Sequence, residues 1–80
     1  MPTVLRDGPY RVYFYSHEPN EPPHVHIDRD NLSAKFWLRP VSLARNFGFG
    51  AKELRKLHSL VTAHQAEFTE AWNGYFGVGG

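Results

Sequence analysis

The first half of the chain alternates apolar and polar residues with a period of two, which predicts half-buried β-strands. The clearest run is 24–28, where Val25 and Ile27 are expected on one side of a strand and the two histidines with Asp28 on the other. The same alternation, interrupted by turn residues, predicts strands at about 3–6, 10–16, 24–28 and 32–38, and at 41–47, where a short helical turn is the alternative.

Turn signals separate these runs. Asp7-Gly8 predicts a two-residue hairpin of type I′, in which both central residues have positive φ. Three prolines within 17–23 exclude a helix there, and the polar run 29–31 predicts a further turn.

The last third of the chain changes to a spacing of three and four residues, which predicts one long helix over about 51–73. Gly50 is expected to precede this helix as its cap, and Gly74 to end it. One face of the helix collects the apolar stripe Leu54, Leu57, Val61, His64, Phe68, Ala71 or Trp72, and Tyr75. On that stripe His64 is expected to be a core histidine bonded by a backbone group.

Together these elements predict an α+β fold: an antiparallel sheet of four to five strands with one long C-terminal helix packed on one face, as a two-layer sandwich. The 80 residues are expected to form a single domain over 1–80. Nothing remains to cover the opposite side of the sheet, here called the outer face. It is expected to expose Arg11, Tyr13, Tyr15, His24, His26, Asp28, Lys35, Trp37 and Arg39.

Composition restricts the possible functions. The absence of cysteine excludes disulfides and thiolate zinc sites. No signal peptide or membrane-spanning run is visible, so a soluble cytoplasmic protein without membrane contact is expected. The formal net charge of +1 gives no general case for nucleic acid, so such a case depends on where the charges lie.

The residue types on the outer face favour an RNA-binding function. Its aromatic rings could stack on bases and its cations could meet phosphates. His24 and His26 are the candidate catalytic pair, because imidazoles exchange protons near neutral pH. The candidate binding residues are Arg11, Tyr15, Lys35 and Arg39 for phosphate, Trp37 for base stacking, and Tyr13 beside them.

Two other interpretations use the same residues. Tyr, Trp and Arg also dominate protein interfaces, so the outer face could dock a partner or a second copy of the chain. The His24-x-His26 pair could hold a metal with Asp28, His17, Glu18 or Glu21, but none of these has a diagnostic spacing. The sequence therefore predicts no metal and no cofactor.

The chain also resembles a family of small bacterial proteins of about this length whose domain has no known function. The resemblance rests on the stretches MPTV, GPY, FYS, EPPHVH, AKFWL and FG followed by KEL. Members are often encoded beside a second small protein, in an arrangement similar to a toxin–antitoxin pair. The resemblance implies a cognate partner protein encoded nearby; it implies no activity and no catalytic residues.

Overall fold

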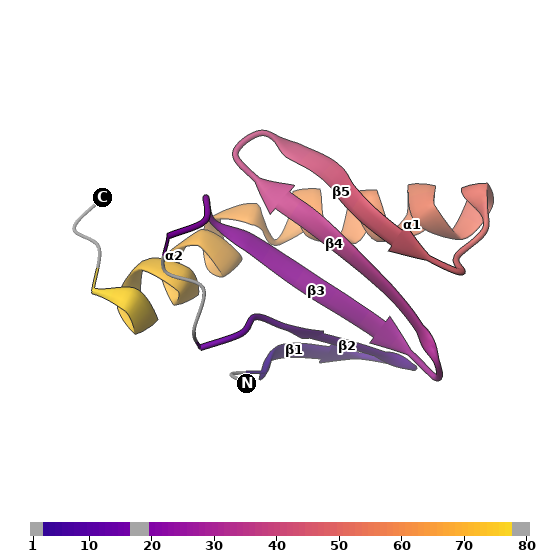
Figure 1. Ribbon diagram of the computed structural model, residues 1–80, viewed down its shortest axis with the longest axis horizontal. Helices are drawn as coiled ribbons and strands as arrows, with labels where there is room; N and C mark the ends of the chain where they lie inside the picture. The colour runs from indigo at the N-terminus through magenta and orange to yellow at the C-terminus, as the bar shows by residue number, and fades with distance from the viewer. Residues whose placement is uncertain (1–2, 17–19, 78–80) are drawn as a thin grey trace.

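A five-stranded antiparallel sheet is the centre of the fold, and both helices lie on one of its faces (Figure 1). The computed structural model describes residues 3–16 and 20–77. The strands are β1 (Thr3–Asp7), β2 (Tyr10–Tyr13), β3 (His24–Arg29), β4 (Leu32–Leu38) and β5 (Val41–Phe47). They follow one another in sequence order across the sheet, each antiparallel to the last. The predicted α+β class is confirmed, and 41–47 is a strand.

Two details of the strands differ from the prediction. β2 ends at Tyr13, so Phe14 and Tyr15 leave the strand, and Phe14 packs on the Trp72 ring at 5.3 Å between centroids. The first hairpin is not a type I′ turn. Asp7 pairs with Tyr10, and Gly8 with φ 57° is the first central residue. The second is Pro9, whose ring fixes φ at a negative value.

The predicted single helix is in fact two, α1 (Ala51–Ala63) and α2 (Gln65–Phe76). The chain leaves helical geometry at His64, with φ −112° and ψ 16°. The His64 ring holds this position, since its Nδ1–H donates to the Leu60 carbonyl over 3.0 Å and the ring stacks on Phe68. The expected backbone bond of His64 is confirmed, but the residue interrupts the apolar stripe.

The helix ends are partly as predicted. Gly50 precedes α1. Gly74 lies inside α2, and Gly77, with φ 67°, ends that helix instead. The helix continues past Gly74 because the rings of Tyr75 and Phe76 pack on Phe14, with centroids 5.5 and 5.6 Å away.

The core lies between the sheet and the helices, as the alternation predicts. Its most deeply buried members come from every layer: Val12, Val25, Ile27, Ala34, Phe36, Leu38, Leu57, Val61 and Phe68. Phe49, in the β5–α1 connection, joins them because the Asn46 amide bonds both its N–H and its carbonyl. Gly48 makes room for this connection at φ 103°, where a Cβ would lie 2.4 Å from the Leu32 side chain.

A polar clasp fixes the start of α1 to the sheet. The Glu53 carboxylate accepts bonds from Tyr10 Oη over 2.6 Å and from Arg29 Nε over 2.7 Å and Nη2 over 2.9 Å. The Arg29 guanidinium, with the Tyr10 hydroxyl, lowers the pKa of Glu53, while the bond to Glu53 raises the pKa of Tyr10. Glu53 therefore joins the first hairpin, β3 and α1 through one side chain.

Candidate nucleic-acid interface

Three rows of side chains cross the outer face, because residues paired across antiparallel strands point to the same side of a sheet. The middle row consists of Thr3, Tyr13, His26, Lys35 and Arg45. One flanking row consists of Arg6, Arg11, Asp28, Ser33 and Phe47, and the other of His24, Trp37 and Ser42. The sheet thus brings together all but two of the predicted site residues: Tyr15, which lies just beyond β2, and Arg39.

His26 is at the centre of this face. Its ring stacks on Tyr13 with centroids 5.4 Å apart and planes 20° apart. Tyr15 meets the same ring edge-on at 4.6 Å, and His24 at 5.2 Å. Three rings therefore fix the position of the His26 imidazole, which remains half-buried rather than open.

Tyr13 was expected on the open surface, and that prediction is wrong. It is 4% exposed, because the Tyr15 and His26 rings lie against it and Arg11 lies 4.7 Å above its ring. Its hydroxyl donates to Asp28 Oδ1 over 3.1 Å, and burial raises its pKa, so Tyr13 stays a neutral phenol. It supports His26 and offers no open ring for stacking.

His24 was also expected to be exposed, and its exposed fraction is 0%. α2 extends past the end of the sheet here, and Trp72 lies 4.8 Å from the His24 ring, with Trp37 at 5.7 Å. The Pro22 carbonyl, 2.9 Å from Nδ1, can only accept a bond, so Nδ1 carries the hydrogen. His24 is thus a packed residue behind His26.

Lys35, one of the two cations of the middle row, is already paired. Lys35 Nζ lies 2.5 Å from Glu21 Oε1 and 4.6 Å from the Trp37 ring centroid. The Lys35 side chain is 13% exposed and that of Glu21 38% exposed. A phosphate that reaches Lys35 must therefore displace the Glu21 carboxylate.

Arg45 was missed by the sequence analysis. The register shifts between Lys35 and Phe36, so that Lys35 pairs with Arg45 while Phe36 pairs with Leu43. Ala44 is the extra residue of this β-bulge, and it turns Arg45, which is exposed, onto the outer face. Simple alternation from Leu43 would have given the opposite side, and nothing in the sequence marks the bulge.

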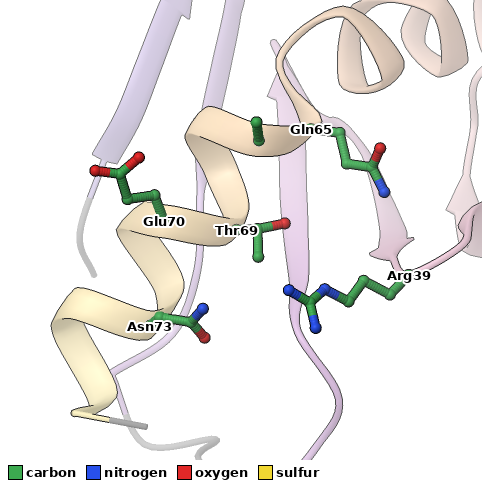
Figure 2. Close-up of a pocket in the computed structure, with 6 residues that line it drawn as sticks. Arg39, Gln65, Thr69, Glu70 and Asn73 are labelled. Carbon is green, nitrogen blue, oxygen red and sulfur yellow. The ribbon is translucent and has the colours of Figure 1, made fainter. Parts of the chain in front are cut away.

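Arg39 lies apart from the other predicted residues. It belongs to the two-residue turn between β4 and β5 and faces α2 across a hollow of about 410 Å³ (Figure 2). The prediction that it stands with Lys35 and Trp37 on the outer face is therefore wrong, because the strand has ended before it.

Metal ligands do not gather within residues 3–16 and 20–77, where no group of three or more His, Cys, Asp or Glu side chains could hold an ion. His17 and Glu18, two of the additional ligands considered, lie outside the described residues. In the same ranges neither helix has the length and apolar content needed to cross a membrane.

These features define a small α+β domain with a polar, aromatic sheet face. The chain matches the family model "Domain of unknown function (DUF4160)" over residues 10–73 and belongs to that family. No curated protein and no solved structure gives a match. The predicted membership of a family of unknown function is confirmed, whereas the neighbouring partner gene stays a prediction.

Proposed function

We propose that this protein is the RNA-directed component of a bacterial, cytoplasmic toxin–antitoxin-like pair, and that its outer sheet face binds single-stranded RNA. The middle row carries the proposal, because it places a fixed imidazole between a tyrosine and two cations on adjacent strands. Arg45 offers an exposed charge for a phosphate, and the half-exposed Tyr15 and Trp37 rings offer stacking surfaces.

Cleavage of the bound strand is the second part of the proposal. His26 accepts the proton of a ribose 2′-hydroxyl, and the 2′ oxygen attacks the adjacent phosphorus. The bond from phosphorus to the 5′ oxygen breaks, the leaving oxygen takes a proton from water, and the imidazolium returns its proton to solvent. The products are a 2′,3′-cyclic phosphate and a 5′-hydroxyl. His24, buried behind His26, acts as a positioning residue.

Binding and cleavage can be measured separately. Fluorescence anisotropy with a fluorescein-labelled 2′-O-methyl RNA, which cannot be cut, reports binding alone. Arg45→Ala is expected to weaken binding about fivefold at 0.1 M salt and to reduce the salt slope by about 0.7, the contribution of one single-strand phosphate contact. The matched control is Arg55→Ala, an exposed arginine of α1, which belongs to the helical layer rather than to the sheet. Equal losses in both variants, or no saturable binding, would contradict the proposal.

Cleavage is followed with unmodified RNA and detection of the cyclic phosphate. His26→Ala is expected to bind the 2′-O-methyl RNA and to lose at least about a hundredfold in cleavage rate. Induced expression of the wild-type chain in a bacterial host should arrest growth, and His26→Ala should not. Full growth arrest by His26→Ala would remove His26 from the chemistry.

A non-enzymatic interaction module is the second candidate. β5 is an edge strand, and it exposes two large apolar side chains, Leu43 at 43% and Phe47 at 59%. Unpaired strand edges recruit further strands, so a second copy could pair along β5. Light scattering on the eluting protein distinguishes the two: a dimer that Phe47→Lys converts to a monomer would favour this candidate.

A further inference from the structure

The hollow beside α2 is a polar concavity that lies apart from the outer face. Figure 2 shows Arg39 reaching toward α2, where Gln65, Thr69 and Asn73 stand on the side of the helix that faces it. The Glu70 side chain also lines the hollow, but its carboxylate points away from Arg39.

Three of these groups have hydrogen-bonding capacity to spare. Within the described ranges, no ion pair or hydrogen bond engages the Arg39 guanidinium, the Thr69 hydroxyl or the Asn73 amide. Thr69 is only 9% exposed, although it is polar and lies in the middle of α2. Gln65 is different, since its Nε2 donates to the Leu38 carbonyl over 2.6 Å and so fixes α2 to the end of β4.

The free groups share one chemical property. A guanidinium, a hydroxyl and an amide can each donate a hydrogen bond, and together they supply one positive charge. A tetrahedral phosphate oxyanion matches such a set, because it accepts several bonds and arginine is the cation best suited to it.

A chain of packed rings links the neighbourhood of the hollow to the outer face. Trp72 precedes Asn73 on α2 and packs on His24, which packs on Trp37 in the flanking row. Arg39 follows Trp37 by two residues, in the turn directly after the same strand. A strand that stacks on Trp37 would therefore bring its next phosphate to this end of the sheet.

We infer that the hollow lined by Arg39, Thr69 and Asn73 binds a phosphate group, and that this phosphate belongs to the backbone of the RNA held on the outer face. The second half of this inference rests on the proposed function. It extends the binding surface around the end of β4 onto α2, beyond the sheet.

The phosphate site is tested without RNA. Inorganic phosphate is titrated into ¹⁵N-labelled protein, and the Asn73 side-chain amide signal is followed by NMR. A saturable shift in the wild type that is lost in Arg39→Gln, but kept in the exposed control Arg55→Gln, is the expected result. No shift, or an equal shift in wild type and Arg39→Gln, would overturn the site whatever the protein does with RNA.

The origin of the phosphate is tested with 2′-O-methyl RNA carrying one uncharged methylphosphonate linkage, moved along the strand. One position should weaken wild-type binding about fivefold at 0.1 M salt. In Arg39→Gln the same replacement should cause no further loss. If RNA binds but Arg39→Gln binds as tightly as the wild type, the inference fails and the proposed function stands. If the wild type binds no RNA, the proposed function fails, and the assignment to RNA fails with it.

Discussion

Replacement of His24 distinguishes a packing role of this side chain from a direct catalytic role. His24→Ala removes an imidazole that is fully buried among Trp37, Trp72 and His26. A cavity of roughly 65 Å³, at about 24 cal/mol per Å³, costs about 1.6 kcal/mol. The lost hydrogen bond to the Pro22 carbonyl adds about 1 kcal/mol. The expected loss of unfolding free energy is therefore about 2.6 kcal/mol.

His24→Phe is the matched variant. It keeps an aromatic ring, somewhat larger than imidazole, and loses the hydrogen bond to the Pro22 carbonyl, so the expected cost is at least about 1 kcal/mol but smaller than that of His24→Ala. Urea unfolding followed by tryptophan fluorescence measures both, since Trp37 and Trp72 lie against the site. The exposed control Leu43→Ala should change stability by less than about 0.5 kcal/mol.

Two results would refute this reasoning. A cost of His24→Ala no larger than that of Leu43→Ala would mean that the ring is not packed as described. A folded His24→Phe that loses RNA cleavage as completely as His26→Ala would mean that His24 takes part in the chemistry. A positioning role predicts instead a partial loss with an unchanged pH profile.

Three further substitutions test the framework of the site. Glu53→Gln should lower stability at pH 7. Because the pKa of Glu53 is lowered in the folded state, its contribution to folding stability is present above the unfolded-state pKa of about 4.3 and is lost as the pH falls through the folded-state pKa. Thermal melts from pH 7 to 3 should therefore converge for wild type and variant at the acid end, and a constant difference would contradict the clasp. Gly48→Ala should cost about 1–3 kcal/mol, because φ is 103° and the Leu32 side chain occupies the Cβ position. Gly74→Ala, inside α2 with open space around it, should instead stabilise the fold by about 0.5–1 kcal/mol. If chemical unfolding gives the same change in stability for Gly48→Ala and Gly74→Ala, the backbone at Gly48 is not strained by a side chain.

The sequence predicts the sheet, because alternation is a local signal: Val25, Ile27, Ala34 and Phe36 are buried as expected. It does not predict the break at His64. There the hydrogen bond from the side chain to the Leu60 carbonyl accompanies an interruption of the helix, whereas the apolar stripe favours a continuous helix, and the two compete. Such competition is decided by tertiary packing rather than by periodicity.

The sequence predicts most of the residues that belong to the outer face but not which of them are exposed to solvent. Alternation places His24 and Tyr13 on the outer face without showing what lies above them. α2 passes the end of the sheet and covers His24, while Arg11 and Tyr15 cover Tyr13. The Ala44 bulge that adds Arg45 depends on strand pairing, which no single-strand pattern contains.

The order of the strands has a consequence for folding. β3, β4 and β5 are joined by two-residue turns, so their pairing closes very short loops, whereas β2 reaches β3 across residues 14–23. Short loops cost less entropy to close, and local contacts form faster. We therefore expect the β3–β5 meander to form early and the first hairpin to dock later. Tyr13 meets His26 only at that docking, so the centre of the outer face is assembled at the end of folding, and a partly folded chain would carry no working site.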